Sequence, residues 1–340
     1  MYYPILKNKT NEMLALENVK SHNFIPIIEL VSANRMKYDE AKKIFEKIKH
    51  ENTIMIDIPN YMNNKVIDKY DLIDPRNRID FFVNFKKEYN NNMIPILSFY
   101  YTDNMKKSIK DNITVLNGLL NEFDEIGIRI LTDKTFKKDD IEILENIDIF
   151  MNGILKKIYI ILEFSQSTVN ELKYFFDNFE IDKFKKVIVT GEIHTADSFL
   201  ENDELQCTLF KNKLLDLVHL LKEKYSSKQI EYGDYTVVDK INQFEDEVRE
   251  GPVFYVPFLR WTTKHGDICK YTAQTVGNME QYKDLCKLII KHPDFDQNHC
   301  STCKDIYTLA NGGDINYKAG GTWKHRMITH HITTMADYLD

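Results

Sequence analysis

Short apolar runs rich in β-branched residues recur through the first two-thirds of the chain, separated by segments with helical spacing. Runs without regular polar alternation are typical of parallel strands that are covered on both faces. These runs occupy positions 3–7, 24–31, 53–58, 93–100, 126–131, 158–163, 186–192 and 230–238. Between them apolar residues recur at i, i+3, i+4 and i+7, most clearly over 41–48, 105–120 and 214–221, which predicts amphipathic helices.

The alternation of eight strands with helices predicts an α/β fold. Eight β/α units over about 240 residues match the size of a closed (β/α)8 TIM-type barrel. An open, doubly wound sheet fits the alternation as well. No glycine-rich phosphate loop follows the first strand, however, and we therefore favour the barrel.

The pattern changes after residue 240. Glu250-Gly251-Pro252 indicates a boundary, and an antiparallel hairpin is predicted over 254–275 with a polar turn at 264–267. A helix is predicted over 279–290, and glycine pairs at 312–313 and 320–321 indicate loops. We expect a barrel domain over 1–240 and, over 241–340, an appendage of hairpin, helix and histidine-rich tail that covers the barrel mouth.

Composition and charge narrow the classes of function. The 340 residues are 43% hydrophobic and 29% charged, which is ordinary for a globular protein with a sizeable core. The formal net charge of -7 leaves no basic field to gather nucleic acid non-specifically. The sequence shows neither a signal peptide nor an apolar stretch of about 20 residues, so we expect a cytoplasmic protein without a membrane partner. There the five cysteines are expected to be reduced thiols or metal ligands.

Polar residues follow the predicted strands where they end, which is the face on which a TIM-type barrel carries its chemistry. There the sequence places Lys7, Glu29, Asp57, Ser98, Arg129, Glu163, Thr190, Glu192 and Asp234. Carboxylates that face Lys7 and Arg129 could bind a divalent metal or perform acid–base catalysis, with Glu29 as the candidate catalytic carboxylate. Each residue could instead cap a helix or pair with a neighbour, the commoner role of a single polar residue at a strand end.

Half of the ten histidines fall in the last fifty residues, and two of them, His330 and His331, are adjacent. Histidine titrates near neutral pH, so both are candidates for proton transfer or ligand binding. Adjacent residues on a helix or strand point in different directions, so the two cannot easily share one metal ion. The appendage also offers Arg260, Asp305 and Trp323. This set suits an anionic ligand, a nucleotide or nucleic acid, and it equally suits a network that docks the tail on the barrel.

A single Cys-x2-Cys pair, Cys300 and Cys303, lies close in sequence to His292 and His299. Two thiolates at this spacing can share a tetrahedral zinc ion, and histidines of the tail could complete the ligand set. One such pair without a second is weak support for zinc. The alternative is two reduced cysteines in a loop.

Further motifs are spread over nearly the whole chain. They are Tyr3-Pro4-Ile5-Leu6-Lys7 with Ala15-Leu16, Phe24-Ile25-Pro26-Ile27-Ile28-Glu29, Ile128-Arg129-Ile130, Ile230-Glu231-Tyr232-Gly233-Asp234-Tyr235, Arg260-Trp261-Thr262, and the tail from His292-Pro293 through Trp323 to His330-His331-Ile332. Together they resemble the beta-protein family of bacteriophages and satellite phages. The chain departs from the family pattern at Lys324, at Thr329 and at Cys303-Lys304-Asp305, where the family tends to show Gly-Asp. The last departure argues against zinc as a function shared by the family.

The resemblance implies a component of a phage-borne or satellite-borne gene cluster linked to anti-phage defence, in which the protein restrains a toxic partner encoded in the same cluster. We expect a sensor or antitoxin-like binding protein that uses the barrel mouth. The candidate ligand-binding residues are Lys7, Glu29, Asp57, Arg129, Glu163, Asp234, Arg260, Asp305, Trp323, His330 and His331. The alternatives are a metal-assisted phosphodiesterase or nuclease of the same module, and a scaffold whose barrel mouth is structural.

Overall fold

The structure is a computed structural model that describes residues 1–31, 53–59, 65–89, 92–98, 105–131, 154–164, 169–193, 205–238, 256–318 and 320–340. The helix predicted over 41–48 and the boundary at Glu250-Gly251-Pro252 lie outside the described residues. Within these ranges, no helix combines the length and the apolar character that crossing a bilayer requires.

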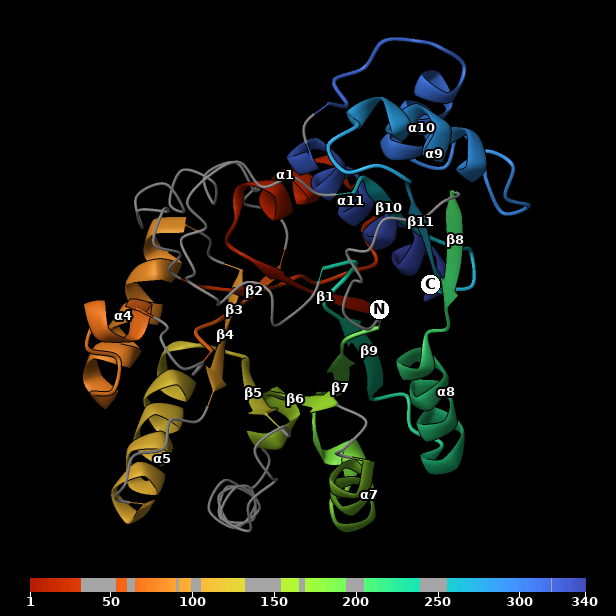
Figure 1. Ribbon diagram of the computed structural model, residues 1–340. Helices are drawn as coiled ribbons and strands as arrows, with labels where there is room; N and C mark the ends of the chain where they lie inside the picture. Colours follow the sequence, from red (N-terminus) through yellow and green to blue (C-terminus); the bar gives the residue numbers. More distant parts are fainter. Residues whose placement is uncertain are drawn as a thin grey trace.

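Eight parallel strands close into a barrel, which confirms the predicted fold class (Figure 1). In order around the ring they are β1 (Tyr2–Lys7), β2 (Ile27–Glu29), β3 (Ile54–Asp57), β4 (Met93–Ser98), β5 (Ile126–Leu131), β6 (Ile158–Phe164), β7 (Lys186–Gly191) and β9 (Ile230–Asp234). Each apolar run of the sequence supplies one of these strands.

The ring closes where β9 pairs with β1, and Tyr3 lies opposite Gly233 at this seam. A Cβ atom on residue 233 would lie 2.6 Å from the carbonyl oxygen of Tyr3. Because backbone cannot move aside as a side chain does, closure at this distance requires glycine.

Helices pack around the barrel, and two of them, α5 and α8, confirm the helices predicted over 105–120 and 214–221. The described ones are α1 (Thr10–Asn18), α3 (Lys65–Lys69), α4 (Pro75–Tyr89), α5 (Met105–Glu122), α7 (Val169–Asn178) and α8 (Lys213–Tyr225). Helix α4 shows how the sequence fixes a start. Its first residue is proline, and the Asp74 carboxylate accepts a hydrogen bond of 2.8 Å from the backbone N–H of Arg76.

Side chains alternate between the inside and the outside of the barrel wall. One buried cluster holds Tyr3, Ile5, Ile27, Met55, Ile94, Ile96, Tyr159, Ile161, Ile188 and Tyr235. Their neighbours in sequence, such as Leu6, Ile28 and Ile56, belong to a larger cluster that also contains helix residues. Because successive strand side chains point to opposite faces, the first cluster is the barrel interior.

The appendage contains an antiparallel sheet with the strand order β10 (Phe258–Thr262), β11 (Ile268–Thr272), β8 (Gln206–Phe210). The first two strands confirm the predicted hairpin, and the predicted helix forms as a 3-10 turn (Met279–Gln281) followed by α9 (Tyr282–Ile289). Strand β8 precedes residue 240 yet pairs with β11, so this sheet draws on chain from both sides of the predicted domain boundary.

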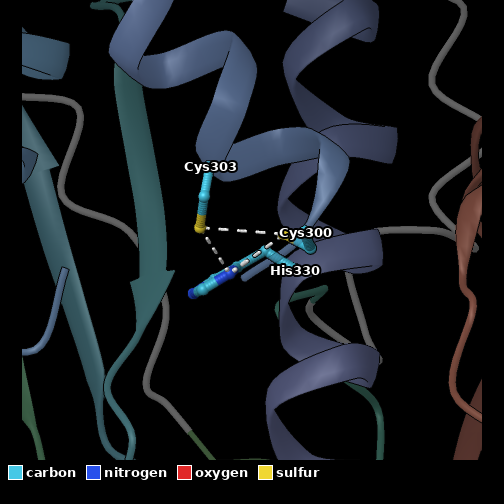
Figure 2. A group of neighbouring side chains, drawn as sticks. All are labelled: Cys300, Cys303 and His330. Atoms are coloured by element: carbon cyan, nitrogen blue, oxygen red, sulfur yellow. Dashed lines mark hydrogen bonds between the residues drawn. The ribbon is translucent and has the colours of Figure 1, made fainter. Parts of the chain in front are cut away.

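Helix α11 (Gly320–Tyr338) joins the barrel to the appendage. Residues 327–336 are all buried, because the helix lies between α1 and the β1 side of the barrel on one side and β10 and α10 (Ser301–Ala310) on the other (Figure 1). Cys300, Cys303 and His330 lie where α10 meets α11 (Figure 2).

One expectation for the tail differs from the structure. The glycines at 320–321 begin α11 and do not form a loop. The helix runs antiparallel to β1 along the outer face of the barrel, since Lys324 pairs with Glu12 near the end of β1 while Met1 donates to the carbonyl of Leu339. The buried part of α11 is covered by α1 and β1 on one side and by β10 and α10 on the other.

Candidate functional site

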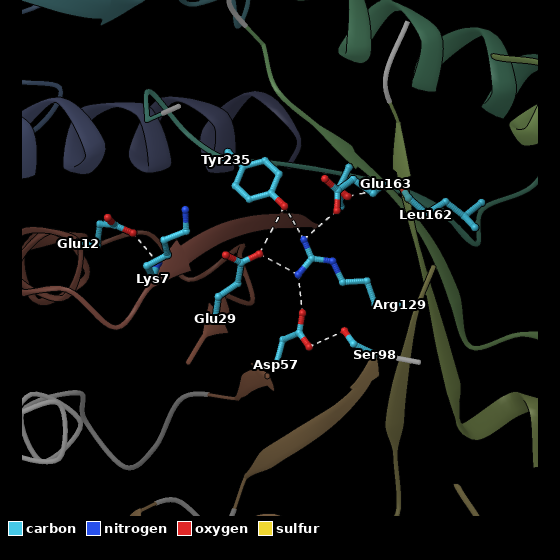
Figure 3. A network of polar contacts seen from close by, with 10 residues as sticks. Lys7, Glu12, Glu29, Asp57, Ser98, Arg129, Leu162, Glu163 and Tyr235 are labelled. Atoms are coloured by element: carbon cyan, nitrogen blue, oxygen red, sulfur yellow. Dashed lines mark hydrogen bonds and ion pairs between the residues drawn. The ribbon is translucent and has the colours of Figure 1, made fainter. Parts of the chain in front are cut away.

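Arg129, on β5, is the centre of a buried polar cluster at the C-terminal ends of the barrel strands (Figure 3). Its Nη1 donates to Glu29 Oε1 at 2.8 Å and also to the carboxylate of Asp57. Its Nη2 donates to Glu163 Oε2 at 3.0 Å and to the phenol oxygen of Tyr235. These five residues, together with Ser98, are called the mouth cluster below.

The barrel positions the mouth cluster through the alternation of its strands. Each member follows an inward-facing residue by two positions, so its side chain faces inward as well. The pairs are Ile27 and Glu29, Met55 and Asp57, Ile96 and Ser98, and Ile161 and Glu163. The register adds contact across the sheet, because Glu29 lies opposite Asp57 and Ser98 opposite Arg129.

Burial shifts the titration of two groups at the mouth toward neutrality. It raises the pKa of Asp57 to about 6, against the lowering effect of Arg129, and Ser98 donates to the same carboxylate at 2.8 Å. It lowers the pKa of Lys7 to about 8, against the raising effect of Glu29. Groups perturbed in this way are typical of functional sites.

Asp234 faces the opposite side of the barrel wall from the mouth cluster. Its carboxylate accepts hydrogen bonds of 2.6 Å from the phenols of Tyr2 and Tyr232, and His331 Nε2 lies 3.1 Å from Oδ2. The sequence predicts one opening shared by all the strand-end residues. This prediction is wrong for Asp234. Side chains alternate along a strand, so Asp234 faces outward because Tyr235, the next residue, faces inward.

The pKa of Asp234 is lower than usual even though the group is buried. Burial alone would raise this pKa, but the charge of His331 and hydrogen bonds from His331, Tyr2 and Tyr232 together lower it. On the other side of its imidazole ring, His331 places Nδ1 2.8 Å from the hydroxyl of Thr262. This arrangement, called the Asp234–His331 pair below, fastens α11 to the barrel wall.

A strained residue directly follows Asp234 and Tyr235 in the chain. Thr236 has φ +58 in the left-handed region, which β-branched residues rarely adopt. Its backbone N–H donates to Asp234 Oδ1 at 2.7 Å. Strain of this kind is often kept at functional sites.

The remaining candidates for ligand binding lie away from the mouth cluster. Arg260 donates to the carbonyl of Val237, and Asp305 pairs with Arg326 at 2.7 Å. Trp323 stacks on Tyr282 with ring centroids 5.2 Å apart, which anchors α11 to α9. Of the other strand-end residues, Thr190 is buried and Glu192 is exposed.

Two of the four predicted metal ligands, Cys300 and Cys303, lie together, and the two histidines contact other residues. Cys300 and Cys303 come together with His330, whereas His292 Nε2 lies 3.9 Å from Cys269 Sγ and His299 Nε2 lies 3.1 Å from the hydroxyl of Thr334. Within the described ranges, no three carboxylates converge as these three residues do. His330 and His331 point to different groups, as their adjacency predicts.

Sequence reasoning missed several polar partners. Tyr235 bonds to Arg129 and to Glu29, and Thr262 contacts both tail histidines. The alternation of side chains along β9 could have identified Tyr235, because it lies two positions after Gly233, which faces inward at the barrel seam. Tyr2 and Tyr232 share the outward parity of Asp234, but nothing in sequence indicates that α11 brings a histidine to them.

Comparisons with known proteins give a family and no named relative. Neither the curated proteins nor the solved structures contain a match to this chain. The family model described as Beta protein matches residues 2–337, which include every barrel strand, the mouth cluster and nearly all of α11. The chain therefore belongs to the Beta protein family.

Proposed function

We propose that this protein is a regulatory binding component of a phage- or mobile-element-encoded anti-phage defence module, and that it acts as a sensor or antitoxin-like protein through its barrel mouth. Family membership supports the phage association. The mouth cluster carries the rest of the proposal, because buried charges from several strands gather on Arg129 at the face where barrels bind their ligands.

The pairing within the mouth cluster favours recognition over metal catalysis. Glu29, Asp57 and Glu163 each contact Arg129, and among the described residues no three carboxylates point to one position, as binding of a divalent cation would need. An anionic group of a ligand can compete for Arg129, and a cationic group can compete for the carboxylates. Because an unpaired buried charge is costly, only a partner that replaces the lost ion pair binds well.

The proposed partner is a protein encoded in the same gene cluster, and co-expression with each neighbouring gene product tests this. We expect the wild-type protein to co-purify with a neighbour and to reduce its toxicity in cells. Glu163→Gln changes the carboxylate of the mouth cluster whose side chain keeps some exposure, at 7%. It should weaken association by about tenfold or more, equivalent to at least 1.4 kcal/mol.

Asp284→Asn is the matched control, because Asp284 is an exposed acid on α9 that pairs with Lys287. Circular dichroism should show that both variants keep the fold. The proposal is wrong if no neighbouring product associates with the chain, or if Glu163→Gln binds as tightly as Asp284→Asn.

The shifted pKa values of Asp57 and Lys7 favour one alternative, a metal-assisted phosphodiesterase or nuclease of the same module, because such groups can transfer protons near neutral pH. Nucleic-acid cleavage should be assayed with Mg²⁺ or Mn²⁺ for the wild type, Glu29→Gln and His330→Ala. Cleavage that is lost in Glu29→Gln would favour the enzyme. Equal cleavage in all three would exclude these residues as catalytic.

A further inference from the structure

Three side chains that bind metals well converge at the contact between α10 and α11 (Figure 2). Cys300 directly precedes α10, Cys303 lies in its first turn, and His330 belongs to α11. The two sulfur atoms are 3.7 Å apart, and His330 Nδ1 lies 3.6 Å from Cys300 Sγ and 3.4 Å from Cys303 Sγ. Cys303 and His330 are buried, and Cys300 is half-buried.

These separations match the edges of a zinc coordination tetrahedron. Zn–S bonds of about 2.3 Å and Zn–N bonds of about 2.05 Å at tetrahedral angles place two sulfurs about 3.8 Å apart and a sulfur about 3.6 Å from a nitrogen. Each of the three observed separations lies close to the calculated one. An ion at the centre of the group would therefore bind without rearrangement of the helices.

The second nitrogen of His330 fixes the orientation and the tautomer of its ring. His330 Nε2 lies 2.8 Å from the carbonyl oxygen of Thr262, and a carbonyl can only accept a hydrogen bond, so Nε2 carries the proton. In the neutral ring Nδ1 then presents its lone pair to the two sulfurs. A backbone carbonyl on the far nitrogen is a common support for metal-binding histidines.

Trp261 completes the surroundings of the group. Its indole stacks on the His330 ring with centroids 5.2 Å apart and planes 13° apart, which restricts rotation of the imidazole. Its buried indole N–H has no hydrogen-bond acceptor among the described residues. A metal-bound thiolate is the acceptor that such a donor needs.

We propose that Cys300, Cys303 and His330 bind one zinc ion. Among the described residues, no further histidine, cysteine or carboxylate joins the group, so the fourth position is taken by water or by a ligand from solution. The site would hold α10 against α11 and is independent of the function proposed for the barrel mouth.

The experiment measures the metal content of the full chain, purified in reductant with a tag that lacks histidine. We expect about one zinc per chain by mass spectrometry. Replacement of zinc by Co²⁺ should give the intense visible bands of a tetrahedral ion and a thiolate-to-cobalt charge-transfer band. Cys300→Ser should reduce zinc affinity by at least about 100-fold, the upper limit for loss of a mere second-shell partner.

Two controls separate a built site from accidental binding. Cys207→Ser removes the exposed cysteine of β8, and His299→Gln changes the residue directly before Cys300, and both should keep full zinc content. Circular dichroism confirms that Cys300→Ser is folded, and Cys303→Ser provides a second variant. Equal zinc content in all variants would overturn the proposal. Reduced wild-type protein without zinc, or a Cys300–Cys303 disulfide in freshly isolated protein, would overturn it too.

Discussion

Replacing Arg129 tests whether the mouth cluster is held together by charge. Arg129→Met keeps much of the apolar stem but removes the guanidinium that the buried carboxylates of Glu29, Asp57 and Glu163 share. Removal of one partner from a buried ion pair typically costs about 3–5 kcal/mol. Three carboxylates share this arginine, so we expect the free energy of unfolding at pH 7.5 to fall by at least that range of about 3–5 kcal/mol.

The loss should depend on pH. Without Arg129 the carboxylate pKa values of the folded state rise above those of the unfolded chain, so stability falls as pH rises through this interval. Urea unfolding followed by circular dichroism at pH 5 and pH 7.5 measures the effect. The loss should be smaller at pH 5, where protonation removes the repulsion.

Two control variants accompany this measurement. Arg129→Lys keeps the charge but loses the forked geometry, and it should lie between the wild type and Arg129→Met. Lys287→Met removes an exposed ion pair on α9 and should leave the unfolding midpoint unchanged. A loss below about 1 kcal/mol for Arg129→Met, or an equal loss at both pH values, would refute the charge-based account.

Four further variants test single positions of the fold. The pKa of Asp57 in the folded state, about 6, lies above the ordinary 3.8. The contribution of Asp57 to the free energy of unfolding is therefore largest below pH 4 and falls by about 3 kcal/mol as pH rises through 6. Urea titrations of Asp57→Asn at several pH values should lack this dependence. The pKa of Asp234 is lowered in the folded state, so its carboxylate contributes to the free energy of unfolding above pH 4, and this contribution is lost as pH falls through the folded-state pKa. The difference in unfolding free energy between wild type and Asp234→Asn should therefore be large at pH 7 and small in acid. Gly233→Ala should lower the melting temperature through a loss of about 1–3 kcal/mol, because the new methyl meets the backbone of Tyr3, whereas Gly321→Ala, with no neighbour closer than 3.4 Å, should not. Equal melting temperatures for the two alanine variants would contradict the account of the barrel seam.

Much of the barrel could be predicted from the sequence because its strands are buried on both faces. A continuous apolar run is a local signal, and eight of them with helical spacing between leave few folds to choose from. Five of the six members of the mouth cluster, all but Tyr235, were predictable for the same reason, since each lies at or near the end of such a run. Asp234 shows the limit of this reasoning. A place at the end of a strand fixes the position of a residue along the barrel axis, but the alternation of side chains along the strand decides whether it faces inward or outward.

The appendage was less predictable because its contacts are distant in sequence. Strand β8 pairs with β11 about sixty positions later, and its exposed residues give no apolar run. The glycines at 320–321 favour a loop locally, yet burial of residues 327–336 of α11 outweighs that preference. Likewise, His330 joins the two cysteines in place of the histidines nearer in sequence, because helix packing and not chain distance brings them together.

Thr262 links the cysteine group to the Asp234–His331 pair. Its carbonyl accepts from His330, which faces Cys300 and Cys303, and its hydroxyl contacts His331, which faces Asp234. Asp234 is joined to the mouth cluster through the adjacent Tyr235. Two histidines side by side on α11 can serve both groups because adjacent helical residues point in different directions. Two adjacent residues of one helix thus contact both the cysteine group and the barrel wall.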